Sequence, residues 1–147
     1  MTCLECHKEL SYIDHKNAME LFGVELCRRH YDRLLKLNKR QKTSLQAIRL
    51  YYGLKEAGEN PMLAWWDGKK SVDIALPRVK LNVEIDHQPQ LYSHKRAMEE
   101  LEEAMQSMNE GFTTLRIPHM LIAEKMRETV QDILQIKAGL QQSQQVI

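Results

Sequence analysis

Three carboxylates occupy positions from which they can meet on two neighbouring strands. Asp73 lies within the apolar segment 71–76, and Glu84 and Asp86 lie within the apolar segment 80–86. Side chains alternate between the faces of a strand, so the two acids of the second segment share one face. A tight turn between the segments pairs them as antiparallel strands and brings the three acids together. Such a cluster is costly unless a cation neutralises it, and its hard oxygen ligands suit Mg²⁺ or Mn²⁺.

A second group of residues has the types and spacing of a zinc site. Two residues separate Cys3 from Cys6, and two residues separate Cys27 from His30. Zinc favours four tetrahedral thiolate and imidazole ligands, and a two-residue spacer lets both members of a pair reach one ion. Four protein ligands leave no open coordination position, so we expect a structural Zn²⁺. A unit of about forty residues buries too little core to fold alone, so the metal would supply folding free energy.

Two alternatives to this ligand set stay open. His7 or His15 could replace one ligand, although neither completes a second pair, or the cysteines could simply be buried beside a surface histidine. Their odd number argues against a disulfide framework. Between the two pairs we expect a β-hairpin with strands at 11–13 and 19–26, and after it a helix over 28–39. This order of knuckle, hairpin and helix resembles a treble-clef zinc finger.

The predicted helix after the zinc pairs is strongly basic. Residues 28–42 contain seven cations and one acid, Asp32. The cations are Arg28, Arg29, Arg33, Lys36, Lys39, Arg40 and Lys42. A run of this kind is often only a solvated face, but on a metal-anchored helix it suits contact with phosphates. We favour contact with nucleic acid.

Composition limits the class of protein. The chain has 147 residues, 43% of them hydrophobic and 28% charged, which fits one soluble domain plus a small appendage. A net charge of +1 excludes a histone-like basic coat but leaves room for a local basic surface. The sequence has no apolar run of about 18 residues and no secretory signal at its start, so we expect a cytoplasmic protein with no membrane partner.

The change in composition near residue 42 predicts three parts. They are a zinc finger with a basic helix over 1–42, a larger unit over 43–140 and a flexible glutamine-rich tail over 141–147. In the larger unit, periodicity and turn residues predict the order αβββαβα. The elements are a helix at 44–57, strands at 62–66, 71–76 and 80–86, a helix around 97–108, a strand at 112–117 and a helix around 121–134. We expect an α/β (α+β) fold with a mixed sheet flanked by helices, and the strands on either side of the helical crossover should be parallel.

The larger unit resembles a known family. The segments 72–77, 80–86 and 115–117 are similar to the PD-(D/E)XK, or restriction-endonuclease-like, superfamily. The similarity is closest to its branch related to the very-short-patch-repair endonuclease, and it runs from about residue 43 to residue 134. Members of this superfamily share the predicted element order and cut phosphodiester bonds with a divalent metal. The resemblance therefore implies a metal-dependent DNA endonuclease.

The same resemblance implies roles for individual residues. Asp73 and Glu84 would be metal ligands, and Asp86 stands where most of the superfamily has its lysine. His87 falls near a histidine of the repair endonuclease and could activate water or protonate the leaving oxygen. The chain departs from the branch at Gln46, where a glutamate is common, and after Asp86, where Asp-Gly-x-x-His is common.

Two further features bear on the partner. Lys95 and Arg96, at the start of the predicted helix around 97–108, could contact phosphate or could be ordinary solvated residues. One of Trp65 and Trp66 could stack on a base. The implied partner is DNA, and cleavage of both strands would need a homodimer or two encounters, because one chain carries one acid cluster.

Two rival functions stay open beside the nuclease. One is a nuclease-like fold that binds nucleic acid without turnover. The other is a protein-interaction adaptor that uses the zinc finger and the acidic segment 99–103.

Overall fold

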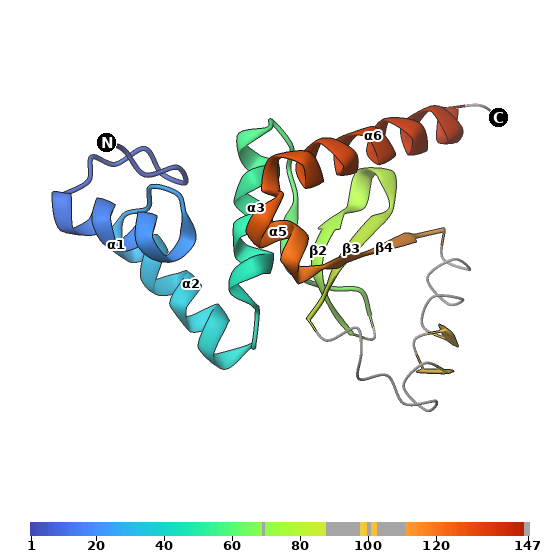
Figure 1. The fold of residues 1–147 in the computed structure, drawn as a ribbon, viewed down its shortest axis with the longest axis horizontal. Helices are drawn as coiled ribbons and strands as arrows, with labels where there is room; N and C mark the ends of the chain where they lie inside the picture. The colour runs from blue at the N-terminus through green and yellow to red at the C-terminus, as the bar shows by residue number, and fades with distance from the viewer. Residues whose placement is uncertain (69, 88–97, 100, 103–110, 146–147) are drawn as a thin grey trace.

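The computed structural model describes residues 1–68, 70–87, 98–99, 101–102 and 111–145. Figure 1 shows two helices at the N-terminal end, followed by a mixed sheet with helices packed on it. The elements are α1 (Tyr12–Phe22), α2 (Arg28–Arg40), α3 (Leu45–Glu56), β1 (Met62–Trp66), β2 (Ser71–Leu76), the 3-10 turn η1 (Pro77–Val79), β3 (Leu81–Asp86), β4 (Thr113–Pro118), α5 (His119–Glu124) and α6 (Met126–Gln145). The predicted mixed α+β fold, preceded by a small Cys/His unit, is confirmed.

The sheet has the strand order β1-β2-β3-β4. The first two pairings are antiparallel, and β3 pairs with β4 in parallel, as the predicted crossover requires. The turn between β2 and β3 is η1, which starts at Pro77 and ends at Lys80 with a φ of 53°. This short connection fixes the register, in which Ile74 lies opposite Val83 and Leu76 opposite Leu81. The predicted bounds of these strands agree with the observed ones to within one residue at each end.

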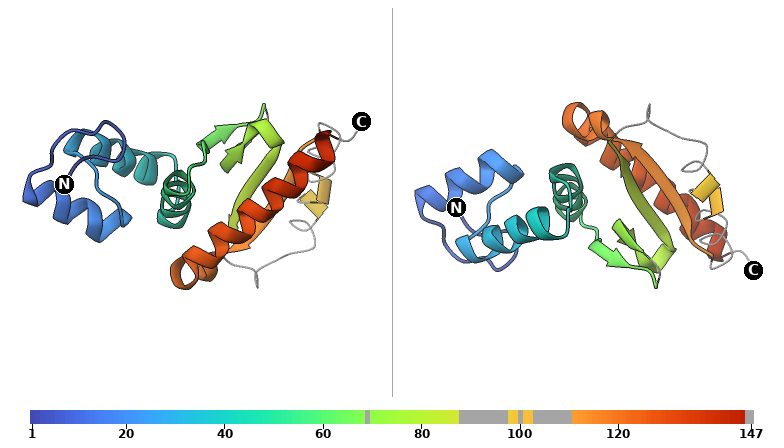
Figure 2. Two further views of the ribbon diagram at one scale, coloured as in Figure 1. Left: turned by 90° about the horizontal axis from the view of Figure 1, so that it is seen from above. Right: turned by 90° about the horizontal axis from the view of Figure 1, so that it is seen from below.

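Helices α3, α5 and α6 pack on one face of the sheet. Figure 2 shows α6 running across this face in both views. The strand residues that face the helices are buried and alternate with residues that are mostly polar, with Ala75 in β2 as an exception. They are Ile74, Leu76, Leu81, Val83, Ile85 and Ile117. The period of two that predicted the strands therefore also separates an apolar face from a polar face.

The N-terminal unit differs from the predicted treble clef. The segment expected to form a β-hairpin is the helix α1, so that prediction is wrong. Ser11 caps this helix by accepting a hydrogen bond from the backbone N–H of Asp14 at 3.2 Å, and Gly23 ends it with a φ of 73°. Ala18 and Phe22, four residues apart, are buried on one side of the helix. Cap, glycine stop and helical spacing together outweigh the short strand-like pattern at 11–13.

The C-terminal end of the chain also departs from the prediction. The last helix is interrupted at Lys125 and then continues as α6 to Gln145, so residues 141–145, expected to be loose, are helical. The helix predicted around 97–108 lies mostly outside the described residues. Its described residues Met98 and Leu101 are helical and exposed.

Helix α3 belongs to two hydrophobic cores. Leu50 and Leu54 pack with the sheet, whereas Ile48 and Tyr52 pack with residues of the N-terminal unit such as Phe22. All four α3 side chains are 2% exposed or less. The small N-terminal unit thus packs against α3, and the sheet packs against another part of the same helix. Among the described helices, none combines the length and apolar character needed to cross a membrane.

Candidate metal centre and polar sheet face

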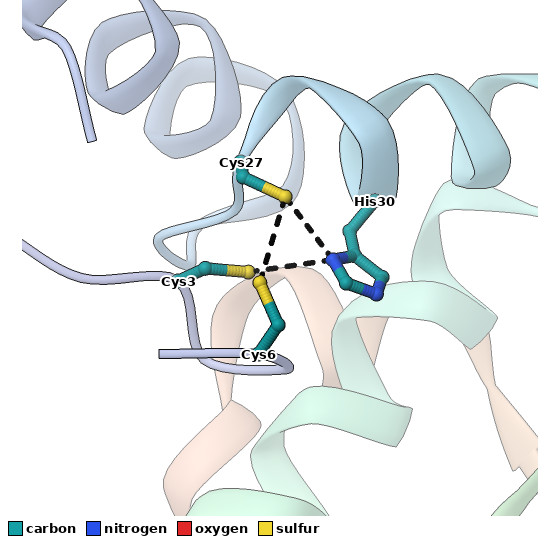
Figure 3. A group of neighbouring side chains, drawn as sticks. All are labelled: Cys3, Cys6, Cys27 and His30. Carbon is teal, nitrogen blue, oxygen red and sulfur yellow. Dashed lines mark hydrogen bonds between the residues drawn. The ribbon is translucent and has the colours of Figure 1, made fainter. Parts of the chain in front are cut away.

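Cys3, Cys6, Cys27 and His30 form a compact group that can hold a zinc ion (Figure 3). Their ligand atoms all lie within 4.8 Å of one another. The Sγ atoms of Cys6 and Cys27 are 3.8 Å apart, and Nδ1 of His30 lies 3.6 Å from the Sγ of Cys3 and 3.1 Å from that of Cys27. A tetrahedral zinc with bonds of about 2.3 Å to sulfur and about 2.0–2.1 Å to nitrogen spaces its ligand atoms by roughly 3.6–3.8 Å. The predicted ligand set fits the ion.

Local backbone geometry brings the two ligand pairs together. The first pair sits on a tight knuckle in which the N–H of His7 donates to the carbonyl of Cys3 at 2.8 Å, with His7 in the left-handed region at a φ of 62°. Cys27 is the N-cap residue of α2, and His30 lies in the first turn of that helix. A knuckle and a helix start therefore present the two pairs.

The surroundings of the thiols favour metal binding. Burial alone would raise the pKa of Cys3, but backbone N–H groups of Cys27, Cys6 and Glu5 donate to its sulfur and lower the pKa overall. For Cys6 the N–H of Lys8 lowers the pKa, yet desolvation and the neighbouring sulfurs of Cys3 and Cys27 raise it more. Crowded thiols resist joint ionisation, and a bound dication removes that penalty.

The histidines considered as substitutes lie elsewhere. His15 contacts the carboxylate of Glu25 at 2.9 Å, and His7 is exposed on the knuckle. Within the part of the chain that the structure describes, the Cys3, Cys6, Cys27 and His30 group is the only set of three or more potential ligands whose atoms come this close. The three acids of the larger unit do not form such a set.

These acids nevertheless belong to one face of the sheet. Alternation places Asp73, Glu84 and Asp86 opposite the helix-covered side, and Glu84 lies directly across from Arg116 of β4. Cations hold both oxygens of the Glu84 carboxylate: Lys70 Nζ lies 2.9 Å from Oε1, and an Arg116 nitrogen lies 3.2 Å from Oε2. Protein cations thus already neutralise Glu84, one of the three acids that we expected a metal to neutralise.

Asp73 is partly buried on this face of the sheet. Its Oδ2 accepts a hydrogen bond from the N–H of Ile85 at 2.9 Å. Burial raises the pKa of Asp73 and the negative charge of Glu84 adds to the rise, while the Ile85 amide, His87 and Arg116 oppose it. The charges of Asp73, Glu84, His87 and Arg116 therefore act on one another. His87 itself is exposed and stacks on His119 with ring centroids 5.8 Å apart.

The basic residues of α2 share one exposed surface. The helix buries Leu34 and turns Tyr31, Leu35 and Leu37 partly inward. The predicted nucleic-acid-binding cations of this helix are all exposed. They are Arg28, Arg29, Arg33, Lys36, Lys39 and Arg40, and we call them the basic face of α2. Lys95 and Arg96, also predicted to contact nucleic acid, lie outside the described residues.

Sequence reasoning missed Lys70 and Arg116 as members of the polar sheet face. Arg116 lies within the segment that resembles the nuclease superfamily, and period two on the last strand puts it on the polar side. Its contact with Glu84 follows only from the register of β3 with β4. Lys70 precedes β2 in the turn after β1, where no periodic pattern reports the direction of a side chain.

No family model, curated protein or solved structure matches this chain. The resemblance to the nuclease superfamily thus stays a prediction that rests on the quoted segments and on the element order.

Proposed function

We propose that this protein binds nucleic acid through the basic face of α2, with a structural zinc fixing the start of that helix. The observation that supports the proposal most directly is the exposure of six cations along a helix whose N-cap and first turn carry two of the four metal ligands. Arg29, Arg33, Lys36 and Arg40 recur at spacings of three and four residues, so they form one stripe. A stripe of this kind follows a phosphate backbone and needs no pocket.

The physical signature of such binding is its dependence on salt. Each neutralised phosphate releases a counterion, so six contacts on duplex DNA give a slope of roughly −5 in a plot of log affinity against log salt concentration. Fewer contacts give a proportionally smaller slope. A protein-interaction adaptor would not bind nucleic acid and would therefore show no such salt-dependent affinity.

The test compares two double variants of equal charge. We expect Arg29→Gln with Arg33→Gln to weaken duplex binding and to reduce the salt slope by about 2. The matched control, Lys125→Gln with Arg127→Gln, removes two exposed cations outside α2, at the junction of α5 and α6. Fluorescence anisotropy at several salt concentrations measures the affinity and the salt slope of each double variant. Equal losses in the two variants, or no binding by the wild type, would contradict the proposal.

A second candidate function is phosphodiester hydrolysis at the polar sheet face. What favours it is the partly buried Asp73, whose pKa is affected by Glu84, on strands that follow the element order of the nuclease superfamily. Lys70 and Arg116, which contact Glu84, could also contact a phosphate. Asp73, Glu84 and Asp86 would hold Mg²⁺ or Mn²⁺, which would supply Lewis-acid activation of the phosphate and of water. Glu84 would have to exchange at least one of its two cation contacts for the metal.

Nicking of supercoiled plasmid in Mg²⁺ or Mn²⁺ tests this second function. If it is correct, Asp73→Asn and Glu84→Gln each reduce the rate by about 100-fold or more, while duplex binding in the absence of metal persists. If the wild type cuts no duplex, single-stranded or mismatched DNA with either metal, hydrolysis is refuted and only the binding function remains.

A further inference from the structure

A cavity of about 250 Å³ lies where the N-terminal unit meets α3 and β1. Its lining comes from Glu5 of the N-terminal knuckle, from α2 and from the start of β1. Helix α2 contributes the ligand His30, Leu34, Leu37 and the exposed Arg33, β1 contributes Met62 and Leu63, and Tyr51 and Tyr52 come from α3. Pockets for drug-sized ligands hold about 300–1,000 Å³, so this cavity suits one smaller group.

The polar part of the cavity is held in place by a network around Glu5. Lys55 Nζ lies 3.0 Å from each carboxylate oxygen of Glu5 and 5.1 Å from the centre of the Tyr51 ring. Tyr51 and Tyr52 meet edge to face with centroids 4.9 Å apart. Burial and the neighbouring Glu5 carboxylate raise the pKa of Tyr52, so its hydroxyl stays protonated and bonds to Glu5. The tyrosine rings and the carboxylate are thus preorganised.

Arg33 connects this cavity with the basic face of α2. It lines the cavity and stands four residues after Arg29 and three before Lys36, within the same exposed stripe. A strand whose phosphates follow that stripe passes the cavity mouth. An aromatic ring, aliphatic walls, an acceptor carboxylate and a cation at the entrance are the groups that hold an unstacked base and its phosphate.

We propose that the cavity receives one unpaired nucleobase of a strand bound along the basic face of α2, with the base packed against Tyr51. The inference rests on the proposed nucleic-acid binding and adds a preference for single-stranded segments. A carboxylate has about four acceptor positions; Lys55 takes one on each oxygen and Tyr52 a third. The remaining position suits the exocyclic amino group of adenine, cytosine or guanine, which thymine lacks.

The experiment measures anisotropy of labelled single-stranded dA, dC and dT oligonucleotides and of a duplex of equal length, using the full zinc-loaded chain. The wild type is expected to bind dA and dC more tightly than dT. Tyr51→Leu should weaken binding of dA and dC by roughly 5- to 100-fold at an unchanged salt slope, with duplex binding unaffected. Tyr51→Trp retains an aromatic ring and should keep most of the affinity. Zinc content and melting temperature verify that the variants are folded.

Lys36→Gln is the matched control for backbone contact. It should weaken single-stranded and duplex binding alike and reduce the salt slope by about 1. If the wild type binds nucleic acid but shows no base preference and no response to Tyr51→Leu, the cavity inference fails and the proposed function stands. If the wild type binds no nucleic acid at all, both fail.

Discussion

Three sulfurs and one imidazole nitrogen lie within 4.8 Å of one another, close to the spacing that a tetrahedral zinc imposes on its ligands. This agreement concerns Cys3, Cys6, Cys27 and His30, the residues predicted from their two-residue spacing. The spacing was sufficient because each pair lies within one turn of chain, so short-range geometry decides it. Asp73 and Glu84 show the contrasting case, since their surroundings depend on residues far along the chain such as Arg116.

Removal of one zinc ligand should abolish stoichiometric zinc binding. We expect Cys6→Ala and His30→Ala to lose the metal, and His30→Cys to keep it, because thiolate and imidazole are both good zinc ligands. Elemental analysis of the purified variants gives the metal content directly. A full equivalent of zinc in Cys6→Ala would show that another residue completes the site.

The raised pKa of Asp73 predicts a definite pH dependence. Because the folded-state pKa lies above its ordinary value of 3.8, the native state holds this proton more tightly than the unfolded chain does. The stability that protonation contributes is complete below that ordinary value and is lost as pH rises through the raised pKa. Asp73→Asn stays neutral and can still accept from the amide of Ile85.

Urea unfolding of wild type and Asp73→Asn at a series of pH values isolates this contribution. The variant should gain free energy of unfolding relative to the wild type as pH rises from about 4 towards 7. A constant difference between the two proteins over this range would mean that the folded-state pKa of Asp73 is not raised.

At the scale of single elements, prediction succeeded where one local pattern dominates. Alternation and the Pro77 turn located β2 and β3, and the helical crossover predicted that β3 and β4 run parallel. It failed at α1, where the cap at Ser11 and the stop at Gly23 set the structure more strongly than the short strand-like pattern at 11–13. Caps are single residues and carry less weight in a pattern search than periodicity does.

The contact between α3 and α6 depends on the absence of a side chain at Gly53. A Cβ at this position would lie 3.2 Å from both Met126 Sδ and Val130 Cγ2. Gly53→Leu should therefore separate the helices and destabilise the protein by about 1–3 kcal/mol. The control Gly139→Ala, where a Cβ meets nothing within 4 Å, should instead stabilise it by about 0.5–1 kcal/mol. Chemical denaturation measures both, and equal effects would refute the close contact.

For the whole molecule, the nearly balanced net charge conceals a local separation of charge. The basic face of α2 lies on the N-terminal unit, whereas the acids Asp73, Glu84 and Asp86 lie on the sheet, partly neutralised by Lys70 and Arg116. Composition predicted the basic segment correctly. It could not predict that the sheet supplies its own cations to Glu84, because that pairing arises from the tertiary arrangement of the turn, β3 and β4.

Loss of zinc should destabilise the sheet as well as the N-terminal unit. Ile48 and Tyr52 of α3 are covered by that unit, while Leu50 and Leu54 of the same helix cover the sheet. Trp65 and Trp66 lie in β1, so tryptophan fluorescence reports on the sheet. We expect a strong chelator to lower the melting temperature seen by fluorescence, and added zinc to restore it. If the melting temperature seen by tryptophan fluorescence does not change with the chelator, the two cores unfold independently.

The double use of α3 also limits how this architecture can be rearranged. A chain that began at residue 43 would keep the sheet but leave Ile48 and Tyr52 facing water, together with the end of Arg49 that donates to the Leu21 carbonyl at 2.9 Å. Any substitute N-terminal segment, whether engineered or acquired by recombination, would have to bring its own apolar cover for that helix. The metal-binding segment is therefore an integral part of the fold rather than an interchangeable attachment.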